Sequence, residues 1–162
     1  MRLMGGLILL SLSICVCVAQ NTDDQVYLSA IGSYKSTFDK VSYNASSEIK
    51  MGNIVYSEGI KFHSPHCGGG QYEGYFNLDR TYNRLTGLIG LDDKNDMKEV
   101  TLILLGDERE LRKIKMLNGD LPENVDLDVS GVRRLALVVI SKKGCSLDVD
   151  LTNMVLQKLP QV

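Results

Sequence analysis

Beyond its first 20 residues, the sequence lacks any apolar run long enough to span a membrane. It lacks an excess of either charge, with 18 Lys and Arg against 20 Asp and Glu, so neither nucleic acid nor an anionic membrane surface is an expected partner. It also lacks a G-x-S-x-G elbow, a phosphate-binding loop and a recognisable catalytic triad. We therefore expect a protein that is not an enzyme, with no catalytic residues, no nucleic-acid partner and no membrane span.

The start of the chain holds the one long apolar stretch. A basic start at Met1 to Leu3 leads into this stretch, which ends at the small residue Ala19 before a polar segment. This order is typical of a secretory signal peptide, and the stretch is too short and too early for a comfortable membrane span. We predict a signal peptide over residues 1–19, a secreted, extracellular protein, and a single domain over residues 20–162.

Two cysteines remain after the predicted leader, Cys67 and Cys145. In an oxidising compartment such a pair most simply forms one disulfide, and two buried free thiols are the alternative. Closing so long a loop stabilises the fold by about 4 kcal/mol in the chain-entropy model. The sequence also has a single N-x-[ST] sequon, at Asn44. In a eukaryotic source it predicts a glycan on an exposed loop.

Helical periodicity is nearly absent, whereas strand-length segments alternate apolar and polar residues with period two. Residues 125–129 alternate most clearly. In residues 147–156 the apolar positions change phase between Leu151 and Met154, which predicts a β-bulge. A hairpin turn is expected at Gly106-Asp107. Eight or nine short strands with no helix between them predict an all-β sandwich or jelly roll.

The stretch "GIKFHSPHCGGG" gathers two histidines, a cysteine and three glycines. Pro65 is expected to end a strand, because it has no N–H for the ladder. His63, His66 and Cys67 together suggest zinc, but a disulfide at Cys67 would remove one of the ligands that zinc needs. We therefore expect His63 to be a hydrogen-bonded residue, structural or at the edge of a site.

Three carboxylates cluster in "GLDDKND", at Asp92, Asp93 and Asp96. Oxygen ligands at this density suit calcium, although the spacing is not that of an EF-hand loop. A structural calcium ion is therefore our single cofactor hypothesis, and a solvated acidic turn is its alternative.

The motifs "VYLSAI", "YSEGIKFHS", "YFNLDRTYNRLTGLIGLDD", "VDLDVSGVRRLALVV" and "DLTNMVL" follow one another in an order that resembles the NPCBM family. That family of carbohydrate-binding modules is related to carbohydrate-binding module family 51. The resemblance covers residues 25–156 and implies a galactose-binding-like jelly-roll β-sandwich that binds carbohydrate, with galactose-containing glycans as ligands. His63 matches the histidine that follows the glycine in the family pattern.

The closing strand departs from the family pattern, because "LDVDLTNM" has neither its histidine nor its tryptophan. The chain has no tryptophan at all, so the commonest platform for stacking a sugar is missing. This departure favours a second hypothesis, an extracellular protein-interaction domain on the same scaffold without sugar binding.

Tyrosine can supply the stacking ring instead, since its face is apolar and its tip is polar. The loop "SYKSTFDKVSYNASSE" offers two such rings, and loops at one end of a sandwich commonly bind ligands. The last strand adds Asp148 and Asp150. These could serve as the carboxylate pair of a glycosidase, but the outward polar face of an edge strand explains them as well. The predicted ligand-binding residues are Tyr34, Lys35, Tyr43, His63, Asp148, Asp150 and Asn153.

Overall fold

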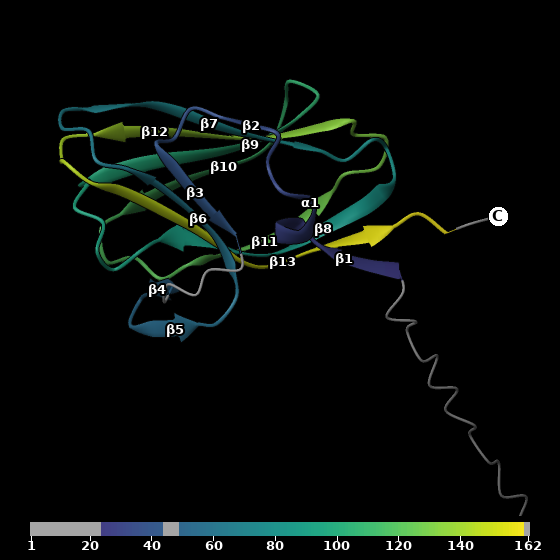
Figure 1. The fold of residues 1–162 in the computed structure, drawn as a ribbon, viewed down its shortest axis with the longest axis horizontal. Helices are drawn as coiled ribbons and strands as arrows, with labels where there is room; N and C mark the ends of the chain where they lie inside the picture. Colours follow the sequence, from purple (N-terminus) through teal and green to yellow (C-terminus); the bar gives the residue numbers. More distant parts are fainter. Residues whose placement is uncertain (1–23, 44–48, 161–162) are drawn as a thin grey trace, which may run out of the picture.

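The computed structural model describes residues 24–43 and 49–160 (Figure 1). These residues form thirteen strands and one short helix, α1 (Leu28–Ile31). The strands are β1 (Gln25–Tyr27), β2 (Lys35–Ser36), β3 (Lys40–Tyr43), β4 (Ile49–Met51), β5 (Ile54–Tyr56), β6 (Gly59–Ser64), β7 (Gly69–Asn77), β8 (Tyr82–Leu91), β9 (Glu99–Gly106), β10 (Arg109–Leu117), β11 (Glu123–Asp128), β12 (Arg134–Lys142) and β13 (Leu147–Lys158). Within the described residues, no helix has the length and apolarity needed to cross a bilayer.

Two antiparallel sheets stack face to face, as the period-two pattern predicts (Figure 1). Sheet A has the order β11-β8-β13-β6-β3, with β1 also paired to β13, and sheet B has the order β10-β9-β12-β7-β2. The apolar core fills the space between the sheets. Strands distant in sequence are neighbours in both sheets, so each end of the sandwich brings together loops from different parts of the chain.

Strand alternation decides which side chains enter this core. In β7, Tyr72 and Phe76 are buried while the residues between and around them face outward or are glycine. Gly74 lies against the ring of Phe62, and a Cβ at this position would come within 2.8 Å of it. Because glycine has no side chain, the Phe62 ring of β6 can pack directly against the backbone of β7.

The predicted β-bulge in β13 is confirmed. The pairing of β13 with β8 shifts register between Thr152 and Val155, and Asn153 has a φ of 52°. Leu151 on one side of the bulge and Met154 on the other both enter the core. The extra residue in the bulge therefore lets apolar side chains on both sides of it point into the core.

Two local expectations were wrong. The hairpin between β9 and β10 turns at Asp107 and Glu108, one residue later than predicted, because Gly106 still pairs with Arg109. The first strand, expected from the sequence around Val26 to Leu28, stops at Tyr27, and the chain continues as α1. A helical turn there places the Leu28 side chain, which is fully buried, into the core.

The small β4–β5 hairpin covers part of the outer face of sheet A (Figure 1). Ile49 and Met51 of this hairpin are buried. The side chain of Ile49 lies over Gly59, and that of Met51 lies over Gly90. Polar residues on this outer face are therefore removed from water, although they do not face the core.

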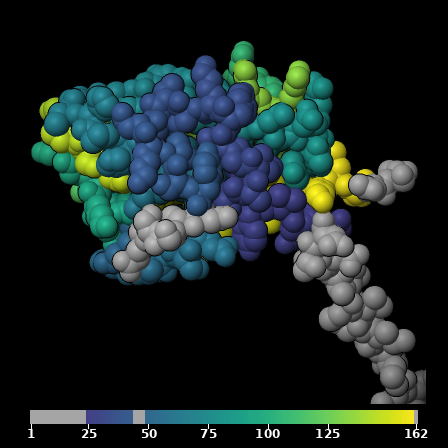
Figure 2. All heavy atoms as spheres, in the orientation of Figure 1, coloured from purple at the N-terminus to yellow at the C-terminus, as the bar shows by residue number. Residues whose placement is uncertain are grey.

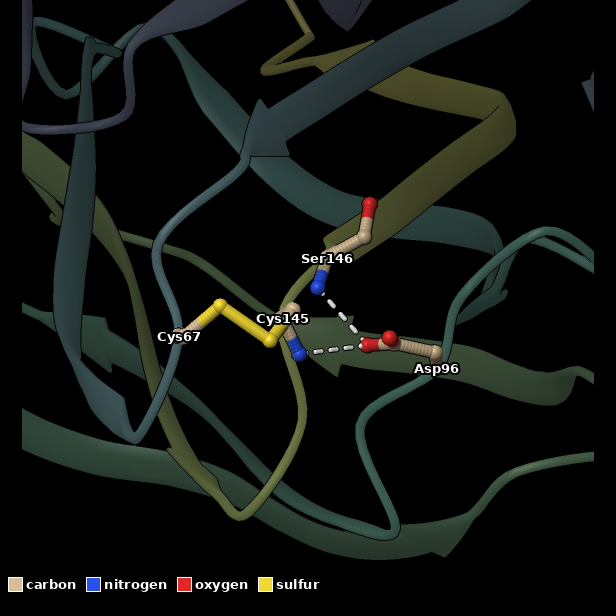
Figure 3. Close-up of a disulfide and its surroundings, with 4 residues drawn as sticks. All are labelled: Cys67, Asp96, Cys145 and Ser146. Atoms are coloured by element: carbon tan, nitrogen blue, oxygen red, sulfur yellow. Dashed lines mark hydrogen bonds between the residues drawn. A yellow bond between two sulfur atoms is a disulfide. The ribbon is translucent and has the colours of Figure 1, made fainter.

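The predicted disulfide between Cys67 and Cys145 is confirmed (Figure 3). It joins the loop before β7 to the loop before β13 across 78 residues of sequence. The carboxylate of Asp96 accepts hydrogen bonds from the backbone N–H groups of Cys145 and Ser146, both at 2.7 Å. These two bonds lower the pKa of Asp96, so the third predicted calcium ligand serves to fix the disulfide loop.

Candidate functional site

An open hollow of about 760 Å³ lies at the end of the sandwich where β7 ends and β12 begins. Four segments line it: the loop before β2, the end of β7, the β9–β10 turn and the start of β12. In Figure 2, blue atoms of the early chain stand near green and yellow-green atoms of the later segments along the upper margin. The lining residues are Tyr34, Asn77, Asp107, Glu108, Arg133 and Arg134.

The β9–β10 turn forms one wall and is fixed to β12. Asp107 and Glu108 have φ values of 48° and 74°, a conformation usually occupied by glycine or asparagine. The Asp107 carboxylate accepts the backbone N–H groups of Arg133 and Arg134 at 2.9 and 2.8 Å. Both bonds hold the pKa of Asp107 below its usual value. The two bonds offset the strain at this turn and make the wall rigid.

An aromatic and cationic layer lies beside the hollow, next to its lining residues Tyr34 and Arg134. The guanidinium of Arg134 and the ammonium of Lys35 each lie 5.6 Å from the centre of the Tyr75 ring, within cation–π range. Arg134 also donates to Glu108 at 3.1 Å. The Tyr75 hydroxyl donates to Glu73, so the ring is held in place. This layer places charged groups at fixed positions beside the hollow.

Tyr34 is the exposed aromatic residue of the hollow. Tyr34 is 58% exposed, and the centre of its ring lies 6.2 Å from the centre of the Tyr75 ring. The Tyr34 hydroxyl, followed by the Glu108 carboxylate, raises the pKa of the Arg134 guanidinium. The hollow thus combines an exposed ring with planar amide, carboxylate and guanidinium groups. Such a set can stack on an apolar face and hydrogen-bond to hydroxyls.

Of the predicted ligand-binding residues, only Tyr34 is among the residues that line this hollow, and the next residue, Lys35, lies over the Tyr75 ring. Tyr43 lies on β3 and does not line the hollow, and its hydroxyl accepts a hydrogen bond from the Ser33 N–H at 2.9 Å. Tyr43 therefore supports the loop that carries Tyr34. Asn153 lies at the bulge of β13, in a separate small crevice shared with Tyr27.

His63 and Asp148 lie on the outer face of sheet A, away from the hollow. They are directly opposite one another on β6 and β13, and His63 Nδ1 is 2.9 Å from Asp148 Oδ1. Ser146 donates to the other carboxylate oxygen at 2.9 Å. The expectation of a hydrogen-bonded His63 is confirmed. His66 is separate from this pair and contacts Asp39 at 3.2 Å.

Asp150 lies in a buried charge cluster under the β4–β5 hairpin. Its residue is fully buried, and neither carboxyl oxygen accepts a hydrogen bond within the described residues. Lys61, directly opposite on β6, instead donates to Asp92 at 2.6 Å. Burial raises the pKa of Asp150 to about 8, and the Asp92 carboxylate adds to this shift. The expectation that Asp148 and Asp150 lie on an edge strand was wrong, because β13 lies between β8 and β6 in sheet A.

The three predicted calcium ligands each have their own partners. Asp92 pairs with Lys61, and burial alone would raise its pKa, but the Lys61 ammonium and the Lys94 N–H hold it below its usual value. Asp93 accepts the Asn53 N–H at 3.0 Å. In the part of the chain that the structure describes, no three His, Cys, Asp or Glu residues are grouped to hold a metal. Calcium binding stays a prediction.

The glycosylation site predicted at Asn44 lies outside the described residues, as does the signal peptide predicted over residues 1–19.

Sequence reasoning missed most of the lining of the hollow. The missed residues are Asn77, Asp107, Glu108, Arg133 and Arg134. One signal was available: two adjacent arginines follow the Ser130-Gly131 turn and open a strand that is otherwise apolar on both faces. Charged residues at the end of a buried strand often mark the rim of a site.

Solved structures share this architecture. A CBM51 module of a Clostridium perfringens GH95 protein, in complex with methyl-galactose, has a TM-score of 0.64 at 20% identity, covering 82% of this chain and 99% of that one. The CBM51-2 and INT domains of Clostridium perfringens ZmpB have a TM-score of 0.68 at 15% identity, covering 83% and 32%. The tandem CBM51 modules of Sp3GH98 from Streptococcus pneumoniae have a TM-score of 0.65 at 11% identity, covering 86% and 48%. At these identities the likeness shows a shared fold.

No curated protein sequence matches the chain. The NPCBM/NEW2 domain family does match it, over residues 20–156, which is most of its length. The order of motifs and the stacked sheets agree with that match. The chain therefore belongs to the NPCBM/NEW2 domain family.

Proposed function

We propose that this protein is a secreted, non-catalytic carbohydrate-binding module with a galactose-binding-like jelly-roll fold, and that it binds galactose-containing glycans in the hollow beside Tyr34. The observation that carries the proposal is an exposed aromatic ring beside planar polar side chains in a preformed hollow. Sugars offer an apolar C–H face and a ring of hydroxyls, and this combination meets both.

Each group has a separate role in this proposal. The Tyr34 ring stacks on the sugar face, while Asn77 and the free lone pairs of Asp107 and Glu108 receive or bridge hydroxyl groups. The backbone bonds to Asp107 hold this wall in its binding geometry before the ligand arrives. Preorganisation of this kind reduces the entropy lost on binding.

Family membership and structural likeness support the proposal. The matched family is one of carbohydrate-binding modules, and one solved structure of the same fold contains methyl-galactose. The absence of tryptophan makes Tyr34 the residue on which stacking depends.

A matched pair of tyrosine variants tests the proposal. Tyr34→Ala should weaken binding of methyl galactoside by about 10-fold, measured by calorimetry, since aromatic contacts contribute about 0.5–1.5 kcal/mol beyond their buried area. Tyr27→Ala is the control, because Tyr27 is 49% exposed and lines a different crevice. Its affinity should match that of the unchanged protein.

A glycan array, run with and without calcium, sets the limits of the proposal. Signal on galactosides that requires Tyr34 supports it, and signal that appears only with calcium supports the calcium hypothesis. Silence across all glycans under both conditions would overturn sugar binding.

The second candidate function is an extracellular protein-interaction domain. One observation favours it: Ile54 and Val55 on β5 are each more than half exposed, and Leu121, which contacts Gly52 of the same hairpin, is 67% exposed. An apolar group of this kind is common at protein contacts. Capture of a partner that is lost in Val55→Asp but retained in Tyr34→Ala would support this candidate.

A further inference from the structure

We propose that the hollow prefers acidic glycans, those with a carboxylate or sulfate group on the sugar, and that Arg133 binds this anion. The inference rests on the proposed function, since it concerns the ligand class of the same hollow. It follows from which charged groups of the lining are already paired and which are not.

The acidic groups of the lining are already engaged. Asp107 accepts two backbone N–H groups, at 2.9 and 2.8 Å. Glu108 pairs with Arg134 at 3.1 Å. The charge of Arg134 is therefore largely balanced, and its guanidinium is further held against the Tyr75 ring. Each acid that could repel an anionic ligand has a positive partner or an amide partner.

Arg133 has the opposite arrangement, because its backbone is fixed while its side chain is not paired. Its N–H donates to Asp107, and its carbonyl accepts the N–H groups of Leu78 and Asp79 at 2.8 and 3.0 Å. Within the described residues, its exposed guanidinium makes no hydrogen bond or ion pair. A firmly anchored residue thus presents an unused guanidinium to the hollow.

A second cation lies nearby in the β7–β8 turn. Arg80 has a φ of 60°, and its N–H donates to the carbonyl of Val132 at 3.1 Å, next to Arg133. Its positive charge is close enough to act on Asp107. The turn therefore brings additional positive charge toward the same side of the hollow.

The chemistry of guanidinium selects the ligand class. Its planar fork of N–H groups matches carboxylate and sulfate with two parallel hydrogen bonds, which a neutral hydroxymethyl group cannot reproduce. Because Arg133 is exposed, solvent and salt reduce the gain. We expect an advantage of about 10-fold for an acidic sugar at low ionic strength, which is about 1.4 kcal/mol.

Ligands that differ only at C6 test the inference. The full chain is titrated by calorimetry with methyl galactoside, the methyl glycoside of galacturonic acid and methyl galactoside 6-sulfate, and with inorganic sulfate alone. The two acidic sugars should bind about 10-fold tighter than the neutral one, and 0.5 M salt should reduce this difference. Sulfate alone should bind more weakly than every sugar, since it lacks the stacking contact.

Two charge-neutralising variants on one strand provide the comparison. Arg133→Gln should weaken the acidic sugars about 10-fold more than it weakens methyl galactoside. Lys142→Gln, at the far end of the same strand β12, removes the same charge and should leave the preference intact.

The outcomes separate this inference from the proposed function. Equal affinity for neutral and acidic galactosides, or equal losses in Arg133→Gln, would overturn the preference while leaving sugar binding in place. Tight binding of inorganic sulfate alone would also overturn it, because the site would then recognise the anion and not the sugar. Failure of every sugar to bind would overturn both.

Discussion

Replacing Asp150 by asparagine should stabilise the protein at neutral pH, although it removes a buried carboxyl group that lies next to a lysine. Asp150 is fully buried beside Asp92 and opposite Lys61. The single ammonium already donates to Asp92, so a second buried carboxylate would remain unbalanced. Asp150 is therefore protonated at neutral pH and can donate to Asp92. Asparagine has the same shape, is neutral at every pH and can donate an N–H to the same oxygen.

The size of the effect follows from proton binding. The folded pKa of Asp150 is about 8, against an ordinary value of 3.8. Between these two pH values the folded state holds a proton that the unfolded state has released, so the free energy of unfolding falls as pH rises. The contribution of the Asp150 carboxyl to the free energy of unfolding is fully present below pH 3.8 and fully lost above pH 8. At pH 7 the loss reaches about 4 kcal/mol as an upper limit, at ~1.4 kcal/mol per unit.

Urea unfolding at pH 5, 6, 7 and 8 measures this effect. The unchanged protein should lose stability steadily over this range, while Asp150→Asn should have a flatter profile and gain about 1–4 kcal/mol at pH 7. The lowered pKa of Asp92 acts below pH 3.8, so it does not affect this window. Asp126→Asn is the control, since Asp126 is exposed and paired with Arg84. Equal pH slopes in Asp150→Asn and the unchanged protein would refute the reasoning.

Three further predictions concern the disulfide and the β9–β10 turn. Replacing Cys67 and Cys145 by serine should lower the free energy of unfolding by about 4 kcal/mol in a urea titration, and a loss below 1 kcal/mol would contradict the loop-closure argument. Glu108→Gly should raise stability by about 1 kcal/mol, because glycine adopts the φ of 74° without strain. The same change should weaken sugar binding, and unchanged stability would show that the turn is not strained. Asp107→Ala should cost about 1–3 kcal/mol, because it removes two backbone hydrogen bonds; a stable variant with full affinity would show that the wall needs no anchor.

The fold was predictable because its local patterns were unambiguous. Period-two alternation identified the longer strands, although eight or nine were expected and thirteen are present, with β2 and β3 inside a segment expected to be a loop. The phase change after Leu151 predicted the bulge that the register confirms. The pair of cysteines left after a predicted signal peptide predicted the disulfide that the structure has. Each of these features depends on a short stretch of sequence or on a pair of residues, so no knowledge of strand order was needed.

Most of the hollow could not be predicted, because it depends on strand order. Tyr34 was found from its loop, but Asn77, Asp107 and Arg133 come from three other segments. They meet because β12 lies between β9 and β7 in sheet B, an order that no local pattern reveals. Burial of Asp150 was hidden for a similar reason, since its cover is the β4–β5 hairpin, about 100 residues earlier in the chain.

The arrangement of sheet B separates the disulfide, which stabilises the protein, from the hollow proposed to bind sugar. β7 begins beside the Cys67–Cys145 disulfide and ends at Asn77, so the covalent link and the hollow lie at opposite ends of one nine-residue strand. At ~3.3 Å per residue they are roughly 26 Å apart. The wall of the hollow is fixed locally by Asp107, not by the disulfide. Loss of the disulfide should therefore lower stability while the folded fraction keeps its sugar affinity within about 2-fold, because effects at sites this distant are usually independent.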